Sequence, residues 1–155
     1  MTDSEFATFV AETVPAYAAD KVASGQWASS ESIALARGAL DELLPQALAT
    51  PGHFLFTIRA DARSSAVGRL WFAVQERAGQ RIAYVYELYV DPAHRRSGHA
   101  AGALRVLEAQ ASSLGLAGIA LHVFGHNHAA QALYARLGYQ PTDINLYKPL
   151  ASPRA

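Results

Sequence analysis

Residues 82–101 read IAYVYELYVDPAHRRSGHAA, and this stretch decides the fold that the sequence predicts. Its apolar first half predicts a strand that ends at Asp91-Pro92, because proline lacks the N–H that a central strand needs. Its second half is rich in arginine and glycine and leads into a predicted helix with apolar positions at Leu104, Leu107, Ala111 and Leu114. A second apolar strand over residues 119–124 follows, so the stretch opens a strand–helix–strand unit with a right-handed crossover.

Helices and strands are predicted on both sides of this unit. Upstream, strands over residues 53–59, 67–75 and 81–90 form an antiparallel meander. Two helices come before them: the first begins at a capping box of Thr2 and Glu5, and the second buries a face made of Ile33, Arg37, Leu40, Leu43 and Leu44. Downstream, a helix marked by Ala130, Leu133 and Leu137 ends at Gly138, and a last strand covers residues 144–148. The sequence therefore predicts one domain over residues 1–155, of the α/β (α+β) class, with a mixed, mostly antiparallel central sheet and helices on both faces.

The composition excludes several classes of protein. Of the 155 residues, 51% are hydrophobic, which is enough for the core of one domain. The chain has no cysteine, so disulfide frameworks, thiolate metal sites and cysteine nucleophiles are excluded. Charges interrupt every apolar run, and the acidic start MTDSEF is unlike a signal peptide, so we expect a cytoplasmic protein with no membrane partner. Thirteen basic and thirteen acidic residues give a net charge of zero, which argues against a nucleic-acid partner.

The charge is unevenly distributed along the chain. Residues 1–50 carry seven acidic and two basic residues, a net charge of −5, and residues 51–155 carry +5. Acidic side chains on solvated helix surfaces would explain this segregation without any function. The functional alternative is that the N-terminal half attracts a cation and the rest of the chain attracts an anion.

Arg95, Arg96, Ser97 and Gly98 lie where the predicted strand passes into the helix. Backbone N–H groups at the start of a helix bind anions, and arginines add charge-assisted hydrogen bonds. The turn is neither a Walker loop nor a Rossmann fingerprint, because the glycine spacings of both are missing. It predicts a phosphate site, although an ordinary helix start with surface arginines has the same pattern.

Glu87 and His122 are polar residues in otherwise apolar strands. A buried carboxylate must be paired or open on a cleft, so both residues are candidates for acid–base chemistry, although a strand histidine is more often structural. Strand alternation places Val85, Glu87 and Tyr89 on one face, and Tyr84, Tyr86, Leu88 and Val90 on the other. His122, His126 and His128 have no companion carboxylate or thiolate, so we expect no metal site.

Asn127 and Tyr134 define one more candidate face. Asn127 has the side chain of an N-cap for the helix that ends near Leu137. Tyr134 follows almost two helical turns later and therefore projects on the same side. A tyrosine in this place is usually part of the core, but its hydroxyl needs a partner or water.

In this order, the motifs resemble the GNAT N-acetyltransferase superfamily over residues 53–150, in its small stand-alone bacterial form. The family pattern is a strand ending in hydrophobic-Val-Asp-Pro, then (Q/R)-x-x-G-x-(G/A), then N-x-x-A-x-x-L-Y-x-x-L-G-(F/Y). The chain matches the last motif at Asn127, Ala130, Leu133, Tyr134, Leu137, Gly138 and Tyr139. Ala100 stands where many members have glycine. Residues 1–50 match only the superfamily's habit of placing a helical pair over the acceptor site.

The resemblance implies a fold, a co-substrate and a set of binding residues. Two central strands would splay apart in a V that holds acetyl-CoA, without a metal. The backbone of Leu88, Tyr89 and Val90 would pair with the pantetheine, and Asn127 and Tyr134 would lie toward its thioester end. The pyrophosphate would lie in the turn and the first helical residues, which are Arg95, Arg96, Ser97, Gly98, His99, Ala100 and Ala101.

The reaction that the resemblance implies is acetyl transfer from acetyl-CoA to a primary amine. Glu87 or His122 would take the proton of the amine, directly or through water, and Tyr134 would protonate the leaving thiolate. Some protein N-terminal acetyltransferases carry a glutamate base at the position of His122, which leaves the base open here. The acidic first half favours a small cationic acceptor such as a polyamine. The alternatives are a protein or peptide N-terminus as acceptor, a non-catalytic acyl-CoA-binding module and a nucleotide-binding regulatory domain, and a homodimer is left open.

Overall fold

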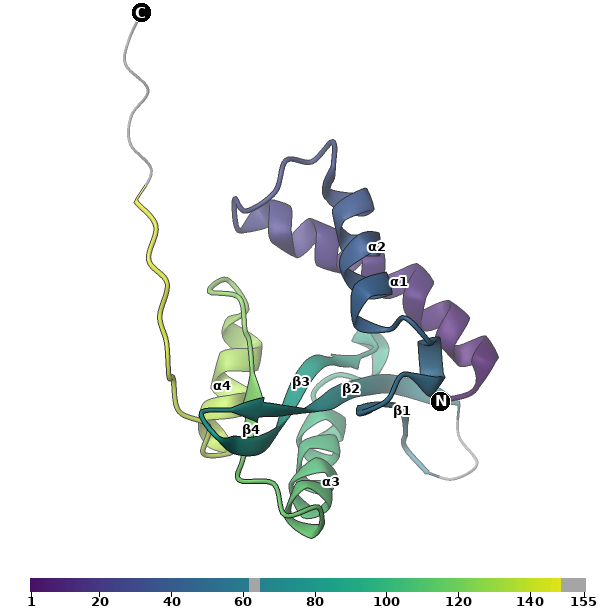
Figure 1. The fold of residues 1–155 in the computed structure, drawn as a ribbon, viewed down its shortest axis with the longest axis vertical. Coiled ribbons are helices and arrows are strands. Elements are labelled where there is room, and N and C mark those ends of the chain that lie inside the picture. The colour runs from purple at the N-terminus through teal and green to yellow at the C-terminus, as the bar shows by residue number, and fades with distance from the viewer. Residues whose placement is uncertain (62–64, 149–155) are drawn as a thin grey trace, which may run out of the picture.

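The computed structural model of the chain describes residues 1–61 and 65–148. It contains a four-stranded sheet in the order β1-β2-β3-β4 (Figure 1). The strands are β1 (His53–Arg59), β2 (Ala66–Arg77), β3 (Gln80–Val90) and β4 (Ile119–Leu121). The helices are α1 (Asp3–Ala23), α2 (Ser32–Leu43), α3 (His99–Ser113) and α4 (His128–Arg136), with 3-10 turns at Ala47–Ala49 and Pro92–His94. Because β1, β2 and β3 pair antiparallel and β4 pairs parallel to β3, the predicted mixed sheet is confirmed.

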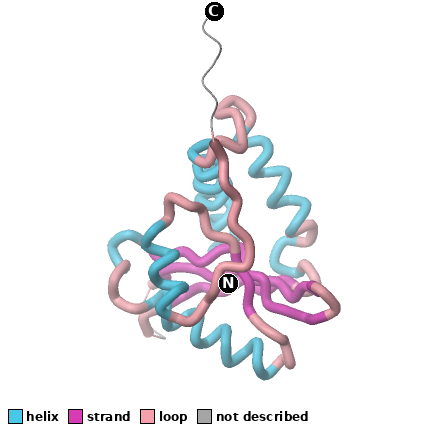
Figure 2. Tube along the Cα trace, turned by 90° about the vertical axis from the view of Figure 1, so that its left-hand side faces the viewer, coloured by secondary structure: helices cyan, strands magenta, loops and turns pink. Residues whose placement is uncertain are grey.

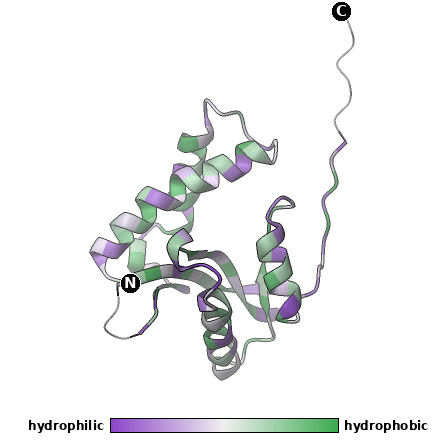
Figure 3. Cartoon of the chain, turned by 180° about the vertical axis from the view of Figure 1, so that it is seen from behind, coloured by the Kyte–Doolittle hydropathy of each residue, from purple (hydrophilic) through white to green (hydrophobic). Residues whose placement is uncertain are grey.

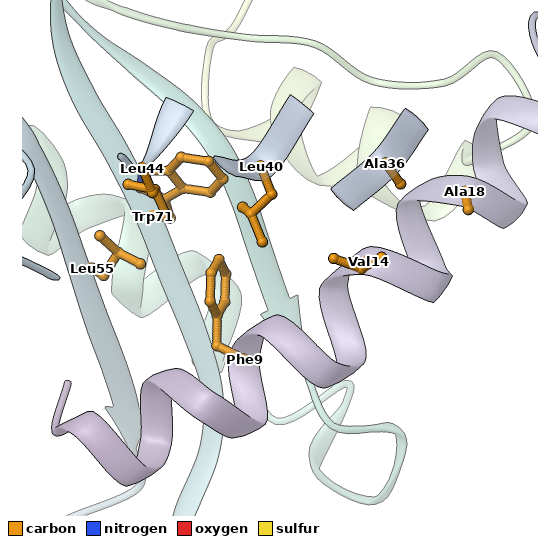
Figure 4. Close-up of a cluster of buried hydrophobic side chains, with 8 residues drawn as sticks. All are labelled: Phe9, Val14, Ala18, Ala36, Leu40, Leu44, Leu55 and Trp71. Carbon is orange, nitrogen blue, oxygen red and sulfur yellow. The ribbon is translucent and has the colours of Figure 1, made fainter. Parts of the chain in front are cut away.

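Helices cover both faces of the sheet, as predicted (Figures 1 and 2). The α1–α2 hairpin packs on one face through a cluster of Phe9, Val14, Ala18, Ala36, Leu40, Leu44, Leu55 and Trp71 (Figure 4). Helix α3 packs on the other face through Leu70, Phe72, Ala83, Val85, Leu104, Leu107 and Ala111, and Leu133 and Leu137 near α4 pack against this second cluster. Among the described residues, 1–61 and 65–148, no helix is both long and apolar enough to cross a membrane.

The start of α1 is the capping box that the sequence predicts. The Thr2 side chain accepts a hydrogen bond from the Glu5 backbone N–H at 3.3 Å, and the Glu5 carboxylate accepts one from the Thr2 N–H at 2.8 Å. These bonds satisfy two of the N–H groups that a helix start leaves without partners. At the other end of the chain, Gly138 has a φ of +87°, which confirms the predicted left-handed helix end.

Helix α2 forms as predicted, but its buried face is different. Ser32, Ala36, Leu40 and Leu44 are buried, whereas Ile33 is exposed and Arg37 pairs with Asp41 on the surface. The small residues allow α1 and α2 to approach closely, since Ala18 and Ala36 are both only 1% exposed. The close packing of α1 against α2 therefore decides which face of α2 is buried, and the size of the apolar side chains on the predicted face does not. Leu114, assigned to the buried face of α3, lies beyond the end of that helix and is 40% exposed.

A β-bulge at Tyr86 overturns the predicted alternation along β3. Trp71 pairs with Glu87 and Phe72 pairs with Val85, so Tyr86 is an extra residue without a partner on β2. Val85 belongs to the α3 cluster, while Tyr86 packs against the α1–α2 cluster beside Glu87. A bulge shifts the alternation by one residue, and for this reason Val85 and Glu87 do not share a face.

Strand β4 is shorter than predicted, and beyond it the two central strands separate. Only Ala83–Val85 pairs with Ile119–Leu121, so the rest of β3 has no partner strand on that side among the described residues. The bulge bends β3 at the point where pairing with β4 stops. This separation is the predicted V-shaped splay, and His122 lies at its mouth, just after β4, rather than inside a strand.

The last strand predicted over residues 144–148 is not formed. This segment is described by the structure, but it is irregular and exposed: Ile144, Leu146 and Tyr147 are 71%, 93% and 87% exposed. Figure 1 shows it as part of an arm that leaves the body of the molecule after α4. The alternation of apolar residues favoured a strand, but a strand needs a neighbouring edge to pair with, and the arm does not lie against one.

Candidate active site

The turn between β3 and α3 has a backbone suited to an anion. Arg96 has a φ of +66° and Gly98 one of +85°, and a non-glycine residue in this region is uncommon. The first helical hydrogen bond of α3 runs from the Gly102 N–H to the Gly98 carbonyl at 2.9 Å. The N–H groups of His99, Ala100 and Ala101 precede it and are therefore left without partners inside the helix. A Cβ built on Gly98 would meet nothing within 4 Å, so the turn faces open space.

The two arginines of the turn have different surroundings. The Arg95 Nε donates a hydrogen bond to the Val90 carbonyl at 2.9 Å, and its guanidinium lies 5.9 Å from the centre of the Tyr89 ring. Arg95 therefore anchors the turn to the end of β3. Arg96 is exposed, and its own backbone has the uncommon positive φ. The geometry of the turn therefore sets the direction in which the Arg96 side chain leaves the backbone.

Glu87 lies in a network between the sheet and α1. Its carboxylate accepts a hydrogen bond from the Thr13 hydroxyl at 2.8 Å and another from the Arg69 Nε at 2.8 Å. Arg69 also pairs with Glu12, and its guanidinium stacks 4.3 Å from the centre of the Tyr89 ring. The side chains of Arg69 and Glu87 are only 11% and 16% exposed. Burial raises the pKa of the Glu87 carboxyl, despite the opposing charge of Arg69 and the hydrogen bond from Thr13.

An aromatic wall adjoins Glu87 on the same face of the sheet. Trp71 and Tyr86 stack with ring centres 4.5 Å apart, and His53 stacks on Tyr86 at 5.7 Å. The Trp71 indole N–H donates to the His53 Nδ1 at 3.1 Å, and burial lowers the pKa of His53, which favours the neutral ring that this bond requires. The Gln75 amide donates to the Tyr86 hydroxyl at 2.7 Å. The bulge is what places this wall beside Glu87.

The sequence reasoning missed Arg69, Thr13 and Glu12, although one signal was available. Arg69 is the one charged residue in the predicted strand over residues 67–75, and the same rule that selected Glu87 applies to it. Thr13 and Glu12 carried no such signal, because their roles depend on how α1 crosses the sheet.

Asn127 lies just before α4 and Tyr134 lies within it, on the other side of the splay. The Asn127 side chain accepts a hydrogen bond from the Ala130 N–H at 3.2 Å, which confirms the predicted N-cap. Tyr134 packs against the α3 cluster, 5.6 Å from the Tyr139 ring, and burial raises the pKa of its hydroxyl. The hydroxyl therefore stays protonated at neutral pH.

His122 is separate from the other candidate residues. Its ring is exposed and lies edge-on to Phe124, with ring centres 5.1 Å apart. No contact described for the resolved ranges joins it to Glu87 or Tyr134. The next histidine, His126, approaches Asp20 of α1 at 3.2 Å and so brings the helical hairpin against the loop before α4. Over residues 1–61 and 65–148, no group of three histidine, aspartate or glutamate side chains is arranged to hold a metal ion.

Proteins with a similar sequence and fold are acetyltransferases. The family model for the acetyltransferase (GNAT) family matches residues 21–139. YycN of Bacillus subtilis, an uncharacterised N-acetyltransferase, is 33% identical over 150 residues, which are 97% of this chain and 96% of YycN. YdgE of the same organism, also an uncharacterised N-acetyltransferase, is 32% identical over 97% of this chain and 95% of its own length. The crystal structure of YycN matches with a TM-score of 0.92 over 98% of this chain and 96% of that chain.

Proposed function

Because the chain belongs to the GNAT acetyltransferase family, we propose that it transfers the acetyl group of acetyl-CoA directly to a small cationic amine, such as a polyamine. The family activity, N-acetylation that depends on acetyl-CoA, is the premise; the acceptor, the direct transfer and the residue roles are the proposal. The observation that carries it is the Glu87 carboxylate, set between the helical hairpin and the sheet next to an aromatic wall.

The residues around the splay fit acetyl-CoA. The N–H groups at the start of α3 and the exposed Arg96 suit the pyrophosphate, which is anionic. The backbone of Leu88, Tyr89 and Val90 has no partner strand on the β4 side within the described ranges, and it can pair with the amides of the pantetheine. Acetyl-CoA supplies an activated acetyl thioester.

The transfer forms an amide bond and breaks the thioester, so one proton must leave the amine and one must reach the sulfur. An alkylammonium acceptor has a pKa of about 10.4, judged from lysine, and must lose its proton first. We assign this step to Glu87, because its raised pKa improves it as a base, with the exposed His122 as the second candidate. Tyr134 donates its hydroxyl proton to the departing sulfur, and the second proton that the nitrogen loses after its attack on the thioester returns to Tyr134, directly or through water. Since the chain has no cysteine, an acylated thiol on the enzyme is not available.

The acceptor class follows from the hairpin and the wall. Residues 1–50 carry a net charge of −5, and α1 contributes Glu12 and Thr13 to the network around Glu87. The half-buried rings of Tyr86 and His53 offer an apolar surface for an alkyl chain and π faces for an ammonium group, and the buried Trp71 stacks against Tyr86. In this proposal residues 1–50 form the roof of the acceptor site within one domain, and residues 53–150 hold acetyl-CoA.

A thiol-release assay with acetyl-CoA tests the proposal. The panel contains polyamines, aminoglycosides, basic peptides with free N-termini, and neutral and acidic amines. We expect turnover with the cationic amines, and the highest kcat/KM with polyamines. A preference for peptide N-termini would make these the acceptor in place of a small cationic amine. A preference for neutral or acidic amines would refute the proposed cationic acceptor. CoA binding without any turnover would indicate a binding module.

A further inference from the structure

The C-terminal arm, residues 141–148, has an apolar surface that no other described part of the chain covers. Ile144, Leu146 and Tyr147 are each more than 70% exposed, and the arm pairs with no strand in the described part of the chain. Figures 1 and 3 show the arm running past α4 and away from the sheet, with hydrophobic residues along it. A solvated tail is polar, and an exposed apolar segment of this kind indicates a contact surface.

Strand β4 has an edge to which such a segment can bind. Across the described ranges β3 is its one partner strand, so the opposite edge of Ile119–Leu121 presents free backbone N–H and C=O groups. An edge of this kind is a template for another strand. The side chains of β4 are half-buried, so an added strand would also complete their burial.

A groove next to this edge supports the same conclusion. It has a volume of about 540 Å³ and is lined in part by Ala111, Leu116, Ile119, Leu137 and Tyr139. The Tyr139 hydroxyl is buried, and no hydrogen-bond partner for it is found in the described residues. Leaving such a group without a partner costs about 1–3 kcal/mol, and the carbonyl groups of an incoming strand would provide an acceptor.

We propose that the arm of one copy forms an additional strand on β4 of a second copy, so that two chains exchange their arms. Pro141 has a fixed φ and disfavours helical backbone at Gln140, and the arm runs away from its own β4 (Figure 1). Each copy has one arm and one open edge, so a reciprocal exchange between two chains leaves no arm and no edge unused, and this closed pair is the arrangement that we propose. The eight residues span roughly 26 Å, enough to follow all of β4.

The mass of the full chain in solution tests the exchange. We expect size-exclusion chromatography with light scattering to give the mass of two chains of 16.6 kDa. The double variant Ile144→Asp/Leu146→Asp should be a folded monomer, because both side chains lie outside the core. Val106→Asp is the matched control: Val106 is 68% exposed on α3, far in sequence from the arm, and this variant should remain a dimer. A monomeric wild type, or an arm variant that stays dimeric, would overturn the proposal.

A cross-linking experiment separates exchange from a fold-back within one chain. Since the chain has no cysteine, Ala120→Cys on β4 and Asn145→Cys on the arm introduce a unique pair. With a short bismaleimide, the double variant should give a covalent dimer that neither single variant gives. Cross-linking within one chain, seen as a monomer that is resistant to a second thiol reagent, would show that the arm packs on its own sheet and would refute the exchange.

Discussion

The two faces of the sheet are built differently. Under α3 no charged side chain is buried among the described residues, and the fully buried side chains are apolar, from Leu70 and Phe72 on β2 to Leu104 and Leu107 on the helix. Under the α1–α2 hairpin, apolar packing surrounds a buried ion pair of Arg69 and Glu87. Burying charges costs free energy even when they are paired, so the second face gives up stability that the first one keeps. This difference fits our proposal that the hairpin face holds the acceptor chemistry, while the α3 face holds the fold.

Tyr134 is the exception that tests this division most strongly, because it packs against the α3 cluster and is still assigned a chemical role. Tyr134→Phe keeps the ring and removes the hydroxyl, so kcat and kcat/KM should both fall about 10²–10⁴-fold with little change in Tm. Tyr139→Phe is the control: it removes a neighbouring buried hydroxyl that has no hydrogen-bond partner among the described residues of the chain, and turnover should persist. A Tyr134→Phe enzyme with wild-type kcat, when chemistry limits the rate, would remove Tyr134 from the mechanism.

Glu87 should control the pH dependence from the hairpin face. The base must be deprotonated, so kcat/KM should rise with pH through the pKa of Glu87, which burial raises above the ordinary 4.5. Glu87→Gln should lower kcat/KM by about 10²-fold or more and abolish this acid limb. Thr13→Val removes a hydrogen bond that lowers the pKa, so the limb should move to higher pH while turnover is retained at the plateau. An unchanged limb in Glu87→Gln would transfer the role to His122.

The apolar face should respond through stability alone. Leu104→Ala leaves a cavity at a fully buried position and should lower the free energy of unfolding by about 2–5 kcal/mol, measured by urea denaturation. Below the new Tm, the pH profile and the KM for the acceptor should match the wild type. The matched change on a solvated side chain, Val106→Ala, should cost less than about 0.5 kcal/mol. A shifted pH profile in Leu104→Ala would mean that the two faces are not independent.

The smallest effect concerns the turn that joins the two faces. Arg96→Ala should weaken CoA binding about tenfold, measured by calorimetry, because it removes a charge-assisted hydrogen bond. Binding of a pantetheine analogue without the pyrophosphate should not change. Arg95→Ala should have a smaller effect, since Arg95 is bound to the Val90 carbonyl, and the double variant should lose the most. Equal losses for CoA and the analogue would place the arginines away from the pyrophosphate.

Local patterns in the sequence were sufficient to predict most of the fold. The capping box, the helix end at Gly138 and the N-cap at Asn127 were predicted because each depends on side chains within a few residues of one another. The strands of the meander were predicted for the same reason.

The features of the fold that could not be predicted from the sequence depend on contacts between distant segments. The bulge at Tyr86 exists only in the register with Trp71, and it decides which side chains accompany Glu87. The buried face of α2 depends on how closely Ala36 can approach Ala18. The arm was predicted as a strand from its own residues, but a strand forms only beside a partner edge, and none lies beside the arm in the described part of the chain.

The bulge at Tyr86 also means that the separation of β3 from β4 can be changed without changing the rest of the fold. If Tyr86 is the residue that stops the ladder between β3 and β4, deleting it restores an uninterrupted register in which the two strands can pair further toward Val90. Such a one-residue deletion would remove no proposed catalytic side chain and would leave the α3 face intact. It would nevertheless let the two strands close together and would remove one ring of the aromatic wall, and so give a folded protein that has lost its site but keeps every proposed catalytic group.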